Sequence, residues 1–215
     1  MAHPYWPLFD LRVRTPQLEL RGVDEELTLA LAELAAEGIH DPETMPFAMP
    51  WTDVAPPQLQ RQALQHYWRG RGEWTPEKWH LALAVLRDGE LVGVQGVRAD
   101  NFAVLRWVET GSWVGRAFQR QGIGKEMRAA VLHLAFAGLG AQVAYSGAWH
   151  DNQASLAVSR ALGYEENGDN IEMRRDQPDR MVKFKLARHV WETRRRDDVV
   201  IEHLAPCLEL FGIAS

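Results

Sequence analysis

The sequence predicts an α+β domain in which a mixed, largely antiparallel sheet is flanked by helices. Apolar runs at Trp79–Leu86 and at residues 91–99 enclose the dipeptide Asp88-Gly89, which together indicate a β-hairpin at the centre of the chain. Two segments with helical character precede this hairpin, and a long alanine-rich segment follows it. Consecutive strands with helices before and after them are typical of the α+β class.

Four segments are expected before the hairpin, in the order strand, helix, loop and helix. Leu18 and Leu20 alternate with polar residues, which indicates a short strand. Asp24 and the acids after it favour a helix start, and Gly38 favours its end. Prolines exclude regular structure from the loop, and a loop of this length is often functional. The segments span residues 15–23, 24–38, 39–57 and 58–70.

The elements expected after the hairpin alternate between strand and helix. Asp151 or Asn152 caps the second helix of this half, and Gly163 ends it. The alanine-rich helix is apolar around much of its circumference, so we expect it to be buried against the sheet. The strands are expected at residues 107–115, 142–149 and 181–191, the helices at 124–140 and 151–164, and an apolar tail that packs on the body at 207–214.

The composition describes a folded protein of one domain. The chain has 215 residues, of which 46% are hydrophobic and 25% charged, so we expect a single domain, 1–215, and no membrane span. The net charge of -5 argues against a nucleic-acid partner. Cys207 is the only cysteine, so nothing points to secretion and a cytoplasmic protein is expected. The eight histidines form no ligand-spaced pair, so no metal is expected.

The segment QRQGIGKEM, residues 119–127, lies between the third strand and the alanine-rich helix. The first turn of a helix has unpaired N–H groups and a positive dipole end, and glycine lets the backbone approach a phosphate. Gly122 and Gly124 therefore predict an anion site, with the alternative that they only form a turn. Neither the nucleoside-triphosphate loop nor the dinucleotide fingerprint matches, because Glu126 and Met127 occupy positions that those motifs give to other residues.

Several motifs resemble the GNAT superfamily of N-acetyltransferases. Residues 119–124 match its acyl-CoA-binding signature [QR]-x-x-G-x-[GA], and DNQASLAVSRALGY, residues 151–164, resembles the helix further along. ETGSWVG, residues 109–115, looks like the strand before the loop in the RimJ/RimL-like branch, which acetylates ribosomal-protein N-termini. The resemblance covers about residues 18–186. It implies the GNAT fold, with central strands that splay apart to form a cleft for acyl-CoA.

The start of the chain and HDPETMPFAMPW also look like actinobacterial members of this superfamily, some of which are thought to carry succinyl groups. The donor implied by the resemblance is therefore acetyl-CoA or succinyl-CoA. The remaining segment, 187–215, would pack on the domain or form an oligomer interface. Dimers are common among similar proteins, so a homodimer is one expectation.

The resemblance assigns residues to the acyl-CoA. The backbone of Trp113, Val114 and Gly115 would bind the pantetheine arm, and the Val114 N–H would also stabilise the thioester oxygen as it gains charge. Asn152 would hydrogen-bond the pantetheine; the alternative is that it only caps the helix. Ser155 lies one turn further along the same helix and would also contact the cofactor. The pyrophosphate would bind the N–H groups of the loop. The loop residues assigned to the cofactor are Gln119, Arg120, Gln121, Gly122, Ile123, Gly124 and Lys125.

Acyl transfer to an amine needs a proton acceptor, because a free amine is almost wholly protonated at neutral pH. Glu109 is the first choice by resemblance, with His80 and His150 as alternatives; Glu109 can equally be a surface salt-bridge residue. Ser155 is the candidate acid for the departing thiolate, because Ser159 stands where many relatives have a tyrosine. A packing role for Ser155, with protonation by solvent, is the alternative.

The acceptor site is expected in the N-terminal third, with Met45, Phe47, Trp51 and Trp74 as candidate walls; a small satellite core under the loop is the alternative for these residues. The implied enzyme moves an acyl group from acyl-CoA to a primary amine by direct attack in a ternary complex. The acceptor is a small-molecule or protein amine. The rival hypothesis is a non-catalytic acyl-CoA-binding sensor or scaffold protein.

Overall fold

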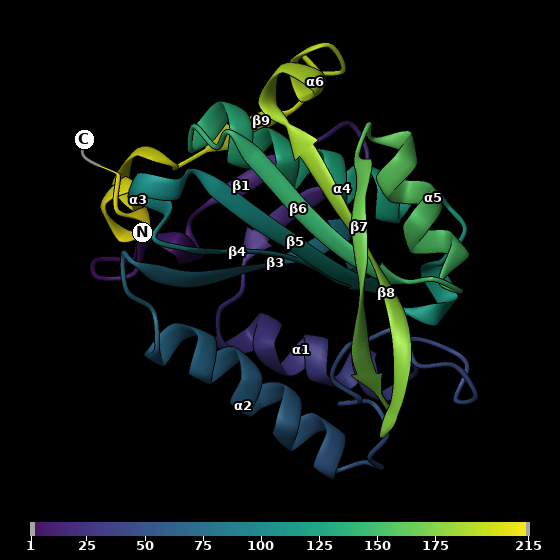
Figure 1. The fold of residues 1–215 in the computed structure, drawn as a ribbon. Helices are drawn as coiled ribbons and strands as arrows, with labels where there is room; N and C mark the ends of the chain where they lie inside the picture. Colours follow the sequence, from purple (N-terminus) through teal and green to yellow (C-terminus); the bar gives the residue numbers. More distant parts are fainter. Residues whose placement is uncertain (1–2, 214–215) are drawn as a thin grey trace.

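The computed structural model describes residues 3–213, which form one nine-stranded sheet with helices on both faces (Figure 1). The strand order is β7-β8-β6-β5-β4-β3-β2-β1-β9, and among the strand pairs of the described residues only β5–β6 is parallel. The predicted α+β class with a largely antiparallel sheet is therefore confirmed. The strands are β1 Arg12–Arg14, β2 Glu19–Gly22, β3 Lys78–Arg87, β4 Glu90–Asp100, β5 Trp107–Val114, β6 Val143–Trp149, β7 Glu165–Arg174, β8 Gln177–Ala187 and β9 Val200–Glu202.

The helices form two layers (Figure 1). Helices α1 (Glu25–Ala36) and α2 (Gln58–Gly72) cover one face of the sheet, and α4 (Ile123–His133) and α5 (Gln153–Ala161) cover the other. Asp24 caps α1 by accepting a hydrogen bond from the Leu27 N–H at 2.9 Å, as its position predicted. The shorter helical segments are Pro7–Phe9, α3 Phe102–Leu105, Arg116–Phe118, Leu134–Gly138, α6 Arg188–Glu192 and Ala205–Phe211.

The central hairpin forms as predicted. Strands β3 and β4 pair from Lys78↔Asp100 to Arg87↔Glu90. Asp88 and Gly89 join them with φ angles of 53° and 83°, the left-handed pair that a two-residue hairpin turn requires. Because this hairpin supplies the middle of the sheet, it fixes where β5 can pair next.

Strands β5 and β6 separate soon after they meet. Their pairing is limited to Trp107↔Val143, Val108↔Ala144 and Glu109↔Tyr145, although β5 continues along β4 to Val114 and β6 continues along β8 to Trp149. Residues 110–114 and 146–149 therefore have no partner strand on their facing edges. This separation is the splay that the resemblance implies.

The alanine-rich helix differs in part from its predicted form. It is buried against the sheet as expected, with Ala130, Val131 and Leu132 almost inaccessible to solvent. However, the α-helix ends at His133, and a π-helical turn, Leu134–Gly138, completes the segment predicted at 124–140. A pattern of apolar residues does not distinguish the two hydrogen-bond registers, so the sequence did not indicate this change.

The C-terminal third contains the largest corrections. Strand β8 begins at Gln177 and ends at Ala187, where α6 begins, so the strand predicted at 181–191 is shifted. Strands β1, β7 and β9 were not predicted; β1 and β9 have three residues each, and β7 is exposed along most of its length, so none shows a clear alternation. The tail packs on the body, with Phe211 buried; Ala214 lies outside the described residues.

Candidate active site

The loop between β5 and α4 has two left-handed residues. Arg120 has a φ of 61° and Gly122 a φ of 84°. The Gln119 side-chain amide holds the start of the loop by donating to the carbonyl of Ile39 at 2.5 Å and to that of Val114 at 2.9 Å. The two left-handed residues turn the backbone sharply between β5 and α4, as such positions do in tight turns.

Five consecutive amides of this loop are free of protein acceptors. Among residues 3–213, no oxygen accepts a hydrogen bond from the N–H groups of residues 120–124, whereas the Lys125 and Glu126 N–H groups both donate to the Gly122 carbonyl. Two of the five free groups belong to the first turn of α4, where the helix dipole is positive. The loop is therefore able to bind a negatively charged group.

The two glycines differ in what they contribute. A Cβ added to either Gly122 or Gly124 would meet no atom within 4 Å. Gly122 has a left-handed backbone that an L side chain rarely adopts, whereas Gly124 lies inside α4 without a positive φ. The turn therefore explains Gly122 but not Gly124, whose open surroundings leave room for a bound group.

The unpaired edge of β5 offers hydrogen-bonding groups to a ligand. The Gly115 N–H donates to the Val92 carbonyl of β4 at 2.9 Å, and backbone groups alternate in direction along an antiparallel strand. The N–H groups of Ser112 and Val114 therefore point away from β4, toward the gap. Of the backbone groups predicted for the pantetheine arm, those of Trp113 and Gly115 therefore face β4, and the Val114 N–H faces the gap together with that of Ser112, which was not predicted.

Helix α5 begins at the other side of the gap. The Asn152 side-chain oxygen accepts a hydrogen bond from the Ser155 N–H at 3.2 Å, so the helix-capping role is present. The Asn152 NH₂ group makes no hydrogen bond to the described residues, and it remains free to donate to a ligand. The Ser155 hydroxyl, on a half-buried side chain, also has no partner within residues 3–213.

Glu109 forms an ion pair on the face covered by α1 and α2. Both of its hydrogen bonds, from the Arg98 Nε at 3.1 Å and Nη2 at 2.6 Å, end on the same oxygen, Oε2. The Oε1 atom accepts no hydrogen bond from the described residues. Glu109 is therefore a salt-bridge residue, which is one of the two roles that the sequence left open. Its second oxygen is still free to accept a proton.

The two alternative bases have different surroundings. His150 follows β6, and its Nδ1 lies 3.2 Å from the Asp179 carboxylate, which leaves Nε2 unpaired in the described chain. His80 lies on β3 near His66, with ring centroids 5.6 Å apart. Burial lowers the pKa of His80 to about 4, with His66 and Arg98 adding to the effect. His80 is therefore neutral at physiological pH.

The four candidate wall residues do not form one site. Phe47 and Trp51 pack on each other at 5.3 Å, and Trp51 packs on Trp113 of β5 at 6.2 Å, beside the gap. Phe47 and Trp51 also pack against the small apolar cluster of Ala35, Ile39 and Leu59, as the satellite-core alternative predicted. Met45 is 1% exposed, so its side chain is buried and forms no open wall. Trp74 lies elsewhere, between α2 and β3, and its indole N–H donates to the Leu210 carbonyl.

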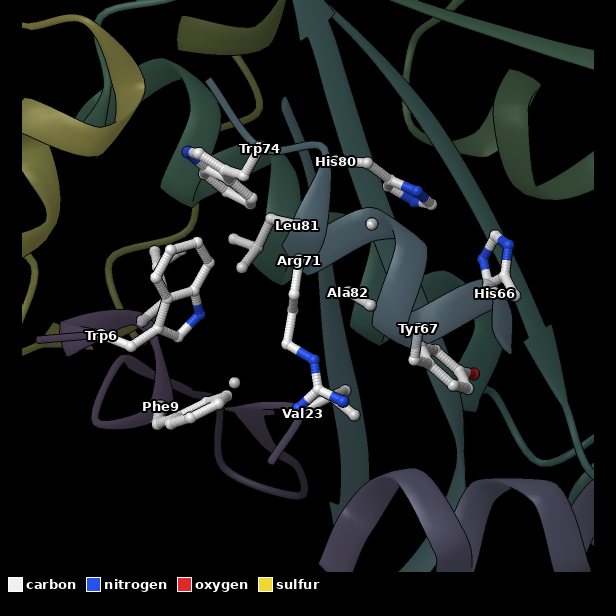
Figure 2. A pocket seen from close by; sticks show the side chains of 13 residues that line it. Trp6, Phe9, Val23, His66, Tyr67, Arg71, Trp74, His80, Leu81 and Ala82 are labelled. Carbon is white, nitrogen blue, oxygen red and sulfur yellow. The ribbon is translucent and has the colours of Figure 1, made fainter. Parts of the chain in front are cut away.

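Trp74 instead lines a small pocket between α2, β3 and the N-terminal segment. Figure 2 shows Trp6 and Trp74 on one side of this pocket, with His66 and His80 on the other. The Arg71 side chain points toward Phe9, whose ring centroid lies 5.8 Å from the guanidinium carbon. The pocket lies away from the 119–124 loop, which takes no part in its lining.

A larger cavity, of about 480 Å³, lies directly beside the loop. Its wall includes Gly122 and Lys125 of the loop region, and Arg194 and Arg196 after α6. Lys125 and Arg194 form no ion pair with any residue in 3–213. The cavity therefore provides uncompensated positive charge next to the free amides.

A parallel strand pair that separates beside a loop of free amides is the arrangement that the resemblance implies for N-acetyltransferases that use an acyl-CoA. Residues 17–165 match the family model described as Acetyltransferase (GNAT) domain. The chain therefore belongs to the GNAT acetyltransferase family, which confirms the resemblance found in the sequence and supports acyl transfer from acyl-CoA.

Solved structures share the fold at low sequence identity. RimL, a ribosomal L7/L12 alpha-N-protein acetyltransferase in complex with coenzyme A, is 19% identical, with 80% of this chain and 95% of that one covered and a TM-score of 0.64. Mycobacterium smegmatis RimJ in complex with CoA-disulfide is 19% identical. The match covers 84% of this chain and 88% of RimJ, with a TM-score of 0.66. A Salmonella typhimurium acetyltransferase that modifies the N-terminal serine of L7/L12 is 19% identical. The match covers 80% of this chain and 96% of that chain, with a TM-score of 0.62.

None of the helices in residues 3–213 has the length and hydropathy of a membrane-spanning segment.

Proposed function

We propose that this protein transfers an acyl group from acyl-CoA to a primary amine by direct attack within a ternary complex. One observation carries the proposal: five free amides lie at the mouth of a gap between two parallel strands. A pyrophosphate matches the charge of the free amides. An extended amide-containing arm matches the hydrogen-bonding edge that follows them, and coenzyme A joins these two parts in one molecule.

The coenzyme A would be distributed along this path. Its pyrophosphate would accept hydrogen bonds from the N–H groups of residues 120–124, and Lys125 and Arg194 would add positive charge at its phosphates. The pantetheine arm would lie along the edge of β5 that faces the gap, and the Val114 N–H would be left for the thioester oxygen. From the opposite side the free NH₂ group of Asn152 would donate to the same arm.

The reaction requires that the acceptor ammonium group lose two protons and that the departing thiolate gain one, and it requires no nucleophilic side chain. Glu109 would take a proton from the ammonium group of the acceptor through Oε1, while its Oε2 stays bound to Arg98. The neutral amine would attack the thioester carbonyl, and the Val114 N–H would stabilise the oxygen as it gains charge. Ser155 would donate its hydroxyl proton to the departing thiolate, and the Ser155 oxygen would take up the second proton, which the attacking nitrogen loses as the amide forms.

The acceptor would approach from the face that carries Glu109. Phe47 and Trp51 border that face beside Trp113, and they would contact the group next to the amine. The RimL structures belong to enzymes named for protein acceptors, which makes a protein N-terminus the acceptor class we would screen first. Polyamines and small amines belong in the same screen.

A Gly124→Val variant tests the cofactor site. Gly124 has open space and no left-handed φ, so a side chain there should leave folding intact and occupy the position of the pyrophosphate. We expect its affinity for coenzyme A, measured by calorimetry, to fall at least about tenfold, which corresponds to about 1.4 kcal/mol. Thermal unfolding without ligand should be nearly unchanged.

Gly72→Val is the matched control, because Gly72 also has no neighbour within 4 Å and lies at the end of α2. It should bind coenzyme A like the wild type. If the wild type binds no coenzyme A ester, or if Gly124→Val binds as tightly as Gly72→Val, the proposed site is wrong.

A further inference from the structure

Arg128 is a buried cation whose role the proposed reaction does not explain. It lies on α4, is 5% exposed, and spans the space between α5 and β5. Its Nη1 donates to the Ser159 hydroxyl at 3.0 Å, and its Nη2 lies 3.5 Å from the Ser112 hydroxyl. Its Nε is buried and has no hydrogen-bond partner. Both of its contacts are therefore neutral, and one donor is unused.

The charge of Arg128 lacks a counter-ion within the chain. No carboxylate of residues 3–213 forms an ion pair with it. Burial lowers the pKa of the Arg128 guanidinium, yet an arginine remains charged in proteins. Buried charges are normally paired, because an uncompensated one costs several kcal/mol. An anion supplied from outside the chain would relieve that cost.

Arg128 stands where the gap between the strands narrows. Ser112 belongs to the unpaired part of β5, between the 119–124 loop and Glu109↔Tyr145, the last pair before β5 and β6 separate. Near that point the Thr110 hydroxyl lies 3.3 Å from the Tyr164 hydroxyl, and the Ser146 hydroxyl donates to the Thr110 carbonyl. Arg128 is thus the cation of a buried, hydroxyl-lined region.

The direction of the cofactor places this region at its acyl end. If the phosphates bind residues 120–124 at the open end of the gap, an arm entering between the strands points its thioester toward the narrow end. This step rests on the proposed coenzyme A site. An acetyl group brings no charge to Arg128, whereas an acyl group that ends in a carboxylate brings the missing anion.

We infer that Arg128 selects acyl-CoA donors whose acyl group ends in a carboxylate, such as a succinyl group. The guanidinium would bind the carboxylate through its unused Nε donor and one of its Nη groups. Two parallel N–H groups of a guanidinium can donate to the two oxygens of one carboxylate, which gives a bidentate pair. Arg128 would bind the donor without taking part in proton transfer.

The experiment compares the affinities of three coenzyme A esters in a calorimeter. Succinyl-CoA and butyryl-CoA have acyl chains of equal length that differ in the carboxylate, and acetyl-CoA is the short neutral donor. Hydrogen bonds to charged groups are stronger than those between neutral groups, so we expect the wild type to bind succinyl-CoA about tenfold or more tightly than butyryl-CoA. Arg128→Met should remove this preference and bind butyryl-CoA at least as well as the wild type.

Two further variants make the result specific. Arg128→Lys keeps a cation and should retain part of the preference for succinyl-CoA. Arg160→Met removes an exposed arginine of α5 that pairs with Glu166, and it should leave all three affinities unchanged. Affinity for free coenzyme A, measured for each variant, shows whether the phosphate site is intact.

The outcomes separate this inference from the proposed function. If free coenzyme A does not bind the wild type, the proposed function fails. If coenzyme A binds but the wild type shows no preference for succinyl-CoA over butyryl-CoA, only the inference about Arg128 is wrong. This comparison uses the wild type alone, so it does not depend on whether a variant folds. Equal weakening of all three esters by Arg128→Met would assign Arg128 a purely structural role and also overturn the inference.

Discussion

At the scale of single residues, the structure separates roles that look alike in the sequence. Gly122 and Gly124 belong to one motif, but only Gly122 is required by the turn. Asn152 caps a helix with its oxygen and keeps its nitrogen free. Glu109 forms a salt bridge with one oxygen and leaves the other unbonded. In each case the structure shows the structural role and leaves another atom or a neighbouring residue without a partner in residues 3–213, so the functional role remains a prediction.

Glu109→Gln tests whether the free oxygen matters for catalysis. The Arg98–Glu109 pair is largely solvent-exposed, and such pairs contribute about 0–1 kcal/mol to stability, so the variant should unfold near the wild-type temperature. If Glu109 accepts the proton, turnover at neutral pH should fall by about 10²-fold or more, whereas affinity for coenzyme A should not change.

Unchanged turnover in Glu109→Gln would remove Glu109 as the base and favour His150, whose Nδ1 faces Asp179. His150→Gln is therefore the parallel variant. A wild type that binds acyl-CoA but transfers no acyl group to any amine would support the sensor hypothesis.

His80 predicts a dependence of stability on pH. Its folded pKa of about 4 lies below the ordinary value of 6.5, so between these values the unfolded chain binds more protons than the folded one. The free energy of unfolding should therefore be fully present above about pH 6.5 and decrease as the pH falls toward 4. Urea unfolding at pH 7.5 and pH 5 measures the difference.

His80→Gln should flatten this dependence, with a difference from the wild type of about 1–2 kcal/mol at pH 5 relative to pH 7.5. His66→Gln should reduce it less, because burial is the larger cause of the His80 shift and the nearby His66 adds to it. Parallel pH profiles for the wild type and His80→Gln would show that His80 does not have this lowered pKa.

At the scale of elements, the start of α5 joins folding to ligand binding. Asn152→Asp keeps an oxygen that can cap the helix, and asparagine and aspartate are comparable caps, so its thermal stability should match the wild type. Because aspartate has no NH₂ group, affinity for coenzyme A should fall. Calorimetry and thermal unfolding of the same samples provide both measurements.

Asn152→Ala is the companion variant, and it removes cap and donor together. It should lose about 1 kcal/mol of stability and also bind coenzyme A more weakly. If Asn152→Asp bound coenzyme A as tightly as the wild type, Asn152 would be a helix cap and nothing more.

Elements with strong local signals were predictable, and those that depend on neighbours were not. The β3–β4 hairpin has a turn dipeptide and two long apolar runs, and α1 has a capping acid, so local chemistry determines both. Strand β9 has only three residues and exists because β1 provides a pairing edge. Similarly, β8 ends at Ala187 because the sheet ends there, although the apolar pattern continues into α6.

At the scale of the whole molecule, the C-terminal tail completes the core at the end of the sheet away from the phosphate loop. The Phe211 ring lies 4.9 Å from that of Trp79 and 5.5 Å from that of Trp74. Phe211 is fully buried, so Phe211→Ala should lower the free energy of unfolding by about 3–5 kcal/mol. Affinity for coenzyme A under native conditions should be nearly unchanged.

The control for this prediction is Val104→Ala, because Val104 is 81% exposed and a surface substitution of this kind should change stability by less than about 0.5 kcal/mol. Denaturant unfolding gives both values. A loss below 1 kcal/mol in Phe211→Ala would mean that the tail is not part of the cooperative core.

The sequence by itself determined the family through the resemblance of its motifs. It also determined the α+β class and the position of the glycine-containing loop, because these depend on turn residues, caps and periodicity that act locally. The tertiary structure alone decided which donor and acceptor atoms have no hydrogen-bond partner among the described residues. The direction of the Ser112 and Val114 N–H groups follows from the pairing of β5 with β4. The isolation of the Arg128 charge follows from the packing of α4 against β5 and α5, which brings hydroxyl groups and no carboxylate to it. Such properties depend on neighbours that are distant in the chain.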